Sequence, residues 1–230
     1  MSARPLDPPA GRPAPVVLLD LDGTLTDSYP GIAASARAAY TALGLPVPDD
    51  ATLRTFVGPP ITGSFAAHGV PADRLTEAVA AYRVHFRAGG MWDNRVYDGV
   101  DDQLRALRAA GARLAVATSK PEVFAQPICE RFGLAAHLEG VFGAPLDHVP
   151  STKADVIARA LAVLGAAAPV DRAVMVGDRE HDVHGAAAHG IACVGVGWGY
   201  ASDGELVAAG AVEVVADVAD LAARVLAHLG

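Results

Sequence analysis

Two aspartates stand two positions apart in a setting that favours chemistry. Asp20 and Asp22 follow the apolar residues 16–19, and Gly23 and Thr24 come directly after them. Carboxylates held this close repel each other unless a cation or a proton offsets the charge, and the backbone N–H groups of Gly23 and Thr24 could face an anion. An Asp-Gly pair can also mark an ordinary turn. The full pattern, an apolar strand running into Asp-x-Asp-Gly-Thr, is rare at ordinary residue frequencies and favours an active site.

Hydroxyl groups and an ammonium group occur in two further segments. Thr118 and Ser119 end a second apolar run, residues 113–117, although Thr-Ser before Lys-Pro is also typical of a turn or a helix start. Lys153 stands near the start of a predicted helix, where a lysine on its own is most often a solvated surface residue. Hydroxyl and ammonium groups suit the oxygens of a phosphate. These three residues are therefore candidates for phosphate binding.

Two more carboxylates, Asp178 and Asp182, lie four residues apart after a third apolar run. If a helix begins at about Glu180, Asp182 falls in its first turn and Asp178 in the loop before it, so both can face one point in space. Capping of that helix by Asp178 is the plain structural alternative. With Asp20 and Asp22 the set holds four carboxylates and no cysteine. Such a set suits a hard ion, Mg²⁺ above Zn²⁺.

Composition narrows the partners. The 230 residues carry a formal net charge of −8 and a pI of about 5.4. An acidic chain repels nucleic acid and anionic membrane surfaces, so neither is expected as a partner, whereas a bound cation lets a small phosphorylated metabolite bind. Cys129 and Cys193 form no CxxC pattern and are predicted to be buried, reduced thiols. With no membrane span or signal peptide visible, the sequence predicts a cytoplasmic protein.

The elements that must position these residues alternate along the chain. Apolar runs that lack polar alternation indicate strands buried on both faces, and strands alternating with helices indicate an α/β fold with a Rossmann-like parallel sheet. In such a sheet the ligand binds beyond the carboxyl ends of the strands, where the candidate residues fall. The predicted strands are residues 16–19, 113–117, 173–176 and 192–196, and the predicted helices are residues 99–110, 122–132, 153–164 and 182–189.

One long segment breaks this alternation. Residues 30–43 and 75–86 have apolar side chains at helical spacing, with little strand signal around them, and Pro and Gly divide the pieces. The proline-rich start of the chain favours disorder. The predicted division is a disordered leader at residues 1–15, a core at residues 16–26 and 97–230, and an inserted helical cap at residues 27–96.

The chemically able segments also resemble a known family. In chain order, residues 20–24, residues 117–120, Lys153 and residues 177–182 resemble the four motifs of the haloacid dehalogenase superfamily. The likeness covers nearly the whole chain after the leader, and the inserted helices look like that superfamily's C1-type cap. More narrowly, residues 58–60, 117–121, 145–147 and 198–200 are similar to the phosphoglycolate phosphatase and 5′-nucleotidase-like branch.

The resemblance implies a Mg²⁺-dependent phosphomonoesterase that works through an aspartyl-phosphate. It makes Asp20 the nucleophile, whose other oxygen binds Mg²⁺. It makes Asp22 the acid and base, whose backbone carbonyl binds the metal. Thr118 and Lys153 would hold the transferring phosphoryl group. The implied substrates are small organic phosphates of the phosphoglycolate or 5′-nucleotide type.

For the fourth motif the resemblance implies that Asp178 ligates Mg²⁺ and that Asp182 orients the ligand shell. His181 and His184, three apart at the same helix start, are predicted to be solvated and not to form a second metal site. Trp198 follows a strand end, but is predicted to be a packing residue more often than a pocket residue.

Substrate selection is expected to come from the cap, because a phosphate site built from core residues alone would accept almost any monoester. Residues 58–64 join a stiff Pro-Pro turn to two hydroxyls, and Thr62 is a candidate substrate contact. An ordinary helix–helix connection explains the same residues equally well. Arg83 is a candidate cation for a substrate carboxylate or second phosphate.

Competing functions stay open at this point. A phosphomutase of the same superfamily would return the phosphate from Asp20 to a sugar. A non-enzymatic metabolite sensor is disfavoured because both Asp20 and Asp22 are present, and a dehalogenase because halide displacement has no use for a carboxylate-rich, metal-binding motif. The sequence allows a monomer or a small homo-oligomer.

Overall fold

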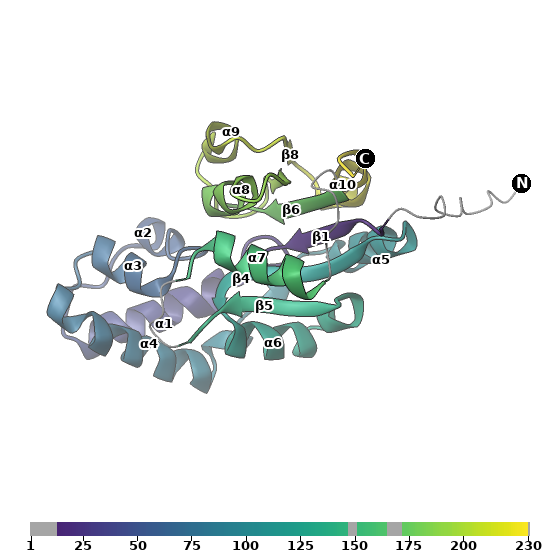
Figure 1. Cartoon of the computed structure of the whole chain (residues 1–230). Coiled ribbons are helices and arrows are strands. Elements are labelled where there is room, and N and C mark those ends of the chain that lie inside the picture. Colours follow the sequence, from purple (N-terminus) through teal and green to yellow (C-terminus); the bar gives the residue numbers. More distant parts are fainter. Residues whose placement is uncertain (1–12, 147–150, 165–171, 230) are drawn as a thin grey trace, which may run out of the picture.

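A six-stranded parallel sheet lies at the centre of the computed structural model, which describes residues 13–146, 151–164 and 172–229 (Figure 1). The strand order is β5-β4-β1-β6-β7-β8, and every neighbouring pair is parallel. The predicted parallel α/β core is therefore confirmed. The strands are β1 (Val16–Leu19), β4 (Arg113–Pro121), β5 (Gly140–Ala144), β6 (Ala173–Gly177), β7 (Ala192–Val196) and β8 (Glu213–Val215).

Strand β1 is apolar at every position because it is covered on both faces. Its four side chains are at most 1% exposed. Val17 and Leu19 join one hydrophobic cluster, while Val16 and Leu18 join another on the opposite face. Because β1 pairs with β4 on one side and β6 on the other, the residue that follows it, Asp20, lies between the ends of both neighbours.

Helices cover both faces of the sheet. Apolar side chains of α5, α6 and α10 belong to the cluster around Val17, and those of α7, α8 and α9 to the cluster around Leu18. The four helices predicted for the core are present, and α8 begins at Glu180, two residues before the predicted start of that helix. The core helices are α5 (Val100–Ala109), α6 (Glu122–Arg131), α7 (Lys153–Val163), α8 (Glu180–Ala187), α9 (Glu205–Ala209) and α10 (Leu221–Ala227).

A helical insert follows β1 and lies at the end of the sheet toward which the strands point (Figure 1). Its interior is a run of aromatic contacts in which Phe65 lies 5.6 Å from Phe56 and 6.2 Å from Tyr82, ring centre to ring centre. The helices predicted at residues 30–43 and 75–86 are present as α1 and α4. The insert helices are α1 (Tyr29–Ala42), α2 (Asp50–Arg54), α3 (Ile61–Ala67) and α4 (Leu75–Ala88).

A two-stranded antiparallel ribbon joins the insert to the core. Strand β2 (Thr26–Asp27) pairs with β3 (Arg95–Val96), and Arg95 forms an ion pair with Asp27 at 3.1 Å. Short 3-10 helices complete the chain trace. They are η1 (Ala72–Arg74), η2 (Gly90–Trp92), η3 (Leu134–His137) and η5 (Val218–Asp220). The domain division at residues 26/27 and 96/97 falls within this ribbon and stays a prediction.

Several sequence-based expectations concern the ends and loops. Most of the predicted leader, residues 1–12, lies outside the described residues, as does Asp147 of the branch-like segment 145–147. Pro15, the last leader residue, already joins the core, because its carbonyl accepts a hydrogen bond from the Arg113 N–H at 2.8 Å. Within the described ranges no helix is long and apolar enough to cross a membrane. Cys129 and Cys193 are buried free thiols.

Candidate active site

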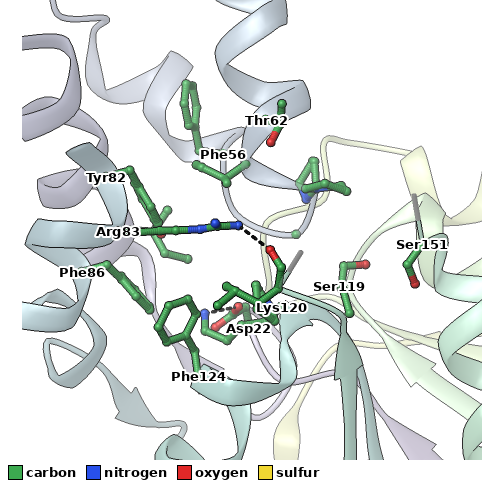
Figure 2. A pocket seen from close by; sticks show the side chains of 18 of the residues that line it. Asp22, Phe56, Thr62, Tyr82, Arg83, Phe86, Ser119, Lys120, Phe124 and Ser151 are labelled. Carbon is green, nitrogen blue, oxygen red and sulfur yellow. Dashed lines mark hydrogen bonds and ion pairs between the residues drawn. The ribbon is translucent and has the colours of Figure 1, made fainter. Parts of the chain in front are cut away.

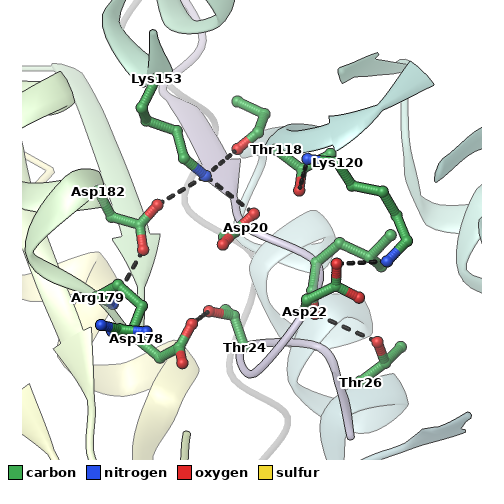
Figure 3. Close-up of polar contacts among 12 residues, drawn as sticks. Asp20, Asp22, Thr24, Thr26, Thr118, Lys120, Lys153, Asp178, Arg179 and Asp182 are labelled. Atoms are coloured by element: carbon green, nitrogen blue, oxygen red, sulfur yellow. Dashed lines mark hydrogen bonds and ion pairs between the residues drawn. The ribbon is translucent and has the colours of Figure 1, made fainter. Parts of the chain in front are cut away.

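Three carboxylates meet at the carboxyl ends of the central strands (Figure 3). Asp20 follows β1, Asp178 follows β6, and Asp182 lies in the first turn of α8. Each can place one carboxylate oxygen so that the three atoms lie within 4.8 Å of one another, and all three residues are buried. The Asp20 N–H donates to the Val176 carbonyl at 2.9 Å, which holds the backbone of Asp20 against β6. The parallel strands end at one edge of the sheet, and this brings Asp20 together with Asp178 and Asp182, which lie far from it in the sequence.

Lys153 is the cation of this cluster. Its Nζ lies 2.9 Å from Asp20 Oδ1 and 2.7 Å from Asp182 Oδ1, and it donates to the Ala117 carbonyl at 3.0 Å. Only 6% of the residue is exposed, so the surface-lysine alternative is wrong. Burial lowers the pKa of Lys153, but the Asp182 and Asp20 charges outweigh burial and raise that pKa above its ordinary value. Lys153 is therefore a fixed positive charge.

Asp182 sits against the strand that precedes it. Its Oδ2 accepts a hydrogen bond from the Arg179 N–H at 3.1 Å, at the start of α8. A Cβ on Gly177 would lie 2.2 Å from Asp182 Cγ, so only glycine at position 177 leaves room for the Asp182 side chain. Burial and the charge of Asp20 raise the pKa of Asp182 to about 6, although Lys153 opposes the shift. The carboxylate charge is therefore costly here without a further cation.

Asp178 is held in one orientation by two donors. Its Oδ1 accepts from the Thr24 hydroxyl at 3.2 Å, and its Oδ2 accepts from the Tyr200 N–H at 2.8 Å. The helix-capping alternative is wrong for Asp178, because the N-cap residue of α8 is Arg179. Burial, then the charges of Asp182 and Asp20, raise the pKa of Asp178 well above its ordinary value. Figure 3 shows its carboxylate turned toward Thr24.

Asp22 points away from this cluster and toward the cap. Its Oδ2 lies 2.5 Å from Lys120 Nζ, with both side chains no more than 8% exposed. Its Oδ1 is buried and has no hydrogen-bond partner among the described residues. Lys120 also lies over the Phe86 ring of α4, 5.1 Å from its centre. No role was predicted for Lys120 from the sequence, although this residue directly follows Thr118-Ser119.

The backbone after Asp22 forms a tight turn. The Gly23 N–H donates to the Thr26 carbonyl at 2.8 Å, so the expectation that this N–H faces an anion is wrong for this structure. Gly23 has φ +86°, and a Cβ there would lie 2.2 Å from Asp178 Oδ2. The Thr24 hydroxyl is engaged with Asp178, and the Thr24 carbonyl accepts from the Trp198 ring N–H at 3.1 Å. Gly23, Thr24 and Trp198 therefore support the site through these contacts. None of the three lines the cavity between core and insert that is described below.

Thr118 and Ser119 occupy different positions at the end of β4. Thr118 is 1% exposed, and its hydroxyl oxygen accepts from the Lys120 N–H at 3.3 Å, which leaves the hydroxyl hydrogen able to point at a phosphate oxygen. Ser119 is half-buried and lines the cavity described next. The structure thus brings Thr118 to the acidic cluster and Ser119 to the cap side.

A cavity of about 560 Å³ lies between the core and the insert (Figure 2). Of the candidate residues, Asp22, Ser119, Thr62 and Arg83 line it, whereas the three-carboxylate cluster does not. Arg83 donates to the Leu146 carbonyl at 3.1 Å across the cavity, and burial, then Arg87, lower the pKa of Arg83. The other lining residues are Ile32, Phe56, Gly58, Pro59, Pro60, Ile61, Tyr82, Phe86, Lys120, Pro121, Phe124, Ala144, Pro145, Leu146, Ser151 and Thr152.

The predicted cap loop is partly helical. Residues 58–60 form the turn, Pro60 is the N-cap residue of α3, and Thr62 lies in the first turn of that helix with its side chain exposed. A second cap–core contact involves Arg179, for which the sequence predicted no role. Arg179 donates to the Val57 carbonyl at 2.7 Å and pairs with Glu205 at 2.7 Å.

The acidic cluster fits a bound divalent cation. Asp20, Asp178 and Asp182 present three buried carboxylates to one point, and Lys153 is the single cation that the described residues place against Asp20 and Asp182. Oxygen ligands of this kind suit Mg²⁺. His181 is half-buried and His184 is exposed, and neither belongs to the cluster.

Comparison with known proteins agrees with this geometry. The family description "Haloacid dehalogenase-like hydrolase" matches residues 17–196. A 5′-nucleotidase of Pseudomonas aeruginosa is 43% identical over 90% of this chain and 93% of its own length. The tyrosine-protein kinase PtkA of Mycobacterium tuberculosis is 48% identical over 83% of this chain and 64% of its own length.

A solved structure has the same fold. The crystal structure of a predicted phosphatase from Clostridium acetobutylicum superimposes with a TM-score of 0.87 at 41% identity, covering 93% of this chain and 99% of that one. The family match covers the insert and the sheet strands from β1 to β7, and β8 lies beyond its end. This chain belongs to the haloacid dehalogenase-like hydrolase family.

Proposed function

We propose that this chain is a Mg²⁺-dependent phosphomonoesterase that acts on small organic phosphates through an aspartyl-phosphate on Asp20. The observation that carries the proposal is the contact between Asp20 Oδ1 and Lys153 Nζ at 2.9 Å. Asp20 directly follows strand β1 and lies beside Asp178 and Asp182. Phosphoryl transfer needs in-line positioning and charge neutralisation more than elaborate covalent chemistry, and Lys153 beside Asp20 contributes positive charge to that neutralisation.

The first half-reaction uses Asp20 and Asp22. Asp20 attacks the phosphorus, the ester P–O bond breaks, and protonated Asp22 gives its proton to the leaving oxygen. Thr118 and Lys153 hold the oxygens of the transferring group. Bound Mg²⁺, held by Asp20, Asp178 and the Asp22 carbonyl, would neutralise charge on those oxygens.

In the second half-reaction Asp22 takes a proton from water, which attacks the phosphorus. The bond between Asp20 and phosphorus breaks, inorganic phosphate leaves, and Asp20 is restored. In the ion pair with Lys120 the Asp22 carboxylate is positioned on the cap side of Asp20, where a leaving group and then a water can reach it.

Buried thiols Cys129 and Cys193 support the cytoplasmic location that we infer.

The test is phosphate release from a panel of monoesters with Mg²⁺. Asp20→Asn should lower turnover at least about a thousandfold, because the amide lacks a nucleophilic oxygen. Asp73→Asn, an exposed aspartate in η1, is the matched control and should leave turnover unchanged. Wild-type enzyme that is incubated with a substrate labelled in its phosphate group and then quenched in acid should carry the label, and hydroxylamine should remove it. The Asp20→Asn variant should carry no label.

The same panel separates the competing functions. A phosphomutase would return the phosphate to a sugar and yield an isomerised sugar phosphate with little free phosphate. A sensor would bind an ester and release no phosphate. Either result contradicts the proposal.

A further inference from the structure

Tyr200 contacts both the acidic cluster and the strand that leads into the insert. It lies in the loop between β7 and α9 and is buried. Its backbone N–H donates to Asp178 Oδ2 at 2.8 Å, and its hydroxyl donates to Asp27 Oδ1 at 2.6 Å. One residue therefore links a proposed metal ligand of the core to β2, by which the chain enters the insert.

The loop that carries Tyr200 is packed tightly against Asp178. A Cβ on Gly199 would lie 2.3 Å from Asp178 Cβ, and a Cβ on Gly23 would lie 2.6 Å from Tyr200 Cδ2. Close-packed interiors of this kind transmit displacements from one group to the next. A shift of residues 199–200 therefore displaces the Asp178 carboxylate as well.

The hydroxyl of Tyr200 holds the entrance to the insert. Besides donating to Asp27, it accepts a hydrogen bond from the N–H of Tyr29, the first residue of α1, at 3.2 Å. Burial, then the hydrogen bond to Asp27, raise the pKa of Tyr200, so the hydroxyl keeps its proton. The other oxygen of Asp27 pairs with Arg95 of β3 at 3.1 Å, so the network reaches both strands of the β2–β3 ribbon.

The insert also contacts this loop from α2. Arg54 donates to the Gly199 carbonyl at 3.2 Å, and its guanidinium lies 4.7 Å from the centre of the Tyr200 ring. Two parts of the insert, its entrance and α2, thus rest on residues 199–200. The seating of the insert on the core and the orientation of Asp178 depend on the same short loop.

We propose that Tyr200 is a positioning residue that couples cation binding at Asp178 to the seating of the insert. The coupling rests on the Mg²⁺ site of the proposed function. A cation bound by Asp178 favours the loop position on which the insert rests. Because such coupling is reciprocal, a seated insert also raises the affinity for the cation.

Calorimetric titration of the protein with Mg²⁺ alone tests the coupling through the Kd. Tyr200→Phe keeps the ring but loses both hydrogen bonds of the hydroxyl, and it should raise the Kd at least about fivefold. Tyr40→Phe is the matched control, because the Tyr40 hydroxyl donates to the His68 carbonyl within the insert. It should leave the Kd unchanged.

Variants of Asp27 separate its hydrogen bond from its charge. Asp27→Ala should raise the Kd for Mg²⁺ by about the same factor as Tyr200→Phe. Asp27→Asn loses the same charge but keeps an oxygen that accepts from Tyr200, and it should restore a Kd near that of the wild type. Arg95→Met breaks only the ion pair across the ribbon and should leave the Kd unchanged. Equal increases for Asp27→Ala and Asp27→Asn would overturn the coupling, because the charge alone would then explain both.

Hydrogen exchange measures the reverse direction of the coupling. Mg²⁺ should slow exchange of the amide hydrogens of the β2–β3 ribbon and the first turn of α1 in the wild type and in Tyr40→Phe, but not in Tyr200→Phe. If Tyr200 only supported the fold, Tyr200→Phe would speed this exchange equally with and without Mg²⁺ and would leave the Kd unchanged.

The same titrations separate failure of the coupling from failure of the proposed function. A wild-type protein that binds Mg²⁺, together with an unchanged Kd in Tyr200→Phe, would reject the coupling and leave the proposed function standing. A wild-type protein that binds no Mg²⁺ would reject the metal site of the proposed function and the coupling with it.

Discussion

Lys120 and Asp22 form a buried ion pair, 98 positions apart in the chain, whose Nζ and Oδ2 atoms are 2.5 Å apart. The pair lies at the inner end of the cavity between core and insert, and the Phe86 ring covers the ammonium from the cap side. The orientation of Asp22 therefore depends on a core lysine that itself contacts the cap. Lys120 acts as a positioning residue for the proposed acid and base.

Replacing Lys120 by Met should lower activity in a way that depends on the leaving group. Poor leaving groups such as alkoxides need a well-placed proton donor, whereas 4-nitrophenolate leaves without one. We expect kcat/KM for alkyl esters to fall by about 10²-fold or more, and that for 4-nitrophenyl phosphate by far less. Steady-state kinetics over a series of leaving groups checks this. Lys120→Arg should restore part of the alkyl-ester activity, and an equal loss for every ester would indicate that Lys120 only supports the fold.

The acidic cluster predicts a metal-linked and pH-dependent stability. Asp182 has a raised pKa of about 6, and the pKa of Asp178 is also raised. Without metal the folded protein binds more protons than the unfolded chain between the ordinary pKa of 3.8 and about 6. This contribution therefore favours the folded state at low pH and is lost as pH rises through that window.

Mg²⁺ binds the deprotonated carboxylates and should cancel that loss. The increase in Tm produced by saturating Mg²⁺ over chelator should thus be larger near about pH 7.5 than near about pH 5. Thermal unfolding at both pH values, with and without the ion, measures it. Asp178→Asn should abolish the increase, while Asp73→Asn should keep it. Equal increases at the two pH values would argue against binding at this cluster.

Lys153 should be costly to remove because two buried carboxylates depend on it. Breaking a buried ion pair from one side destabilises a protein by about 3–5 kcal/mol, and Lys153→Met leaves Asp20 and Asp182 uncompensated. Adding Asp182→Asn removes one of those charges and should recover part of the free energy of unfolding without recovering activity. Urea denaturation of the wild type, both single variants and the double variant gives the coupling. Additive effects would show that the two side chains do not interact.

The strands that carry the site were predictable because burial on both faces leaves an unbroken apolar run. Strand β1 shows this pattern fully, and Asp20 at its end could be assigned to the site from sequence. The edge strands were not predicted. Strand β5 contains Gly140 and Gly143, and β8 has three residues, so neither gives a clear apolar run. Strands β2 and β3 have two residues each, which is too short to show an alternating or an apolar pattern.

The acidic cluster was predictable and the Lys120 pair was not, for a physical reason. Carboxyl ends of parallel strands meet at one edge, so Asp20, Asp178 and Thr118 converge whatever the cap does. The environment of Lys120 depends instead on how Phe86 of the insert packs over the core. Periodicity shows which face of a helix is apolar, but not which core side chain that face covers.

The turn before α3 should be intolerant of any side chain. Gly58 has φ +102°, a conformation that favours glycine, and a Cβ there would lie 3.0 Å from Arg179 Cγ. Gly58→Ala should therefore lower the free energy of unfolding by about 1–2 kcal/mol through backbone strain. It should also weaken the contact of Arg179 with the Val57 carbonyl, which joins cap to core.

Gly63 is the matched control, because it lies inside α3 with open space around its Cβ position. Gly63→Ala should be neutral or stabilise the protein by up to about 1 kcal/mol, since alanine is the better helix former. Urea denaturation of both variants measures the difference, and equal stability of the two would show that the turn at Gly58 adjusts freely and that Arg179 does not depend on its shape.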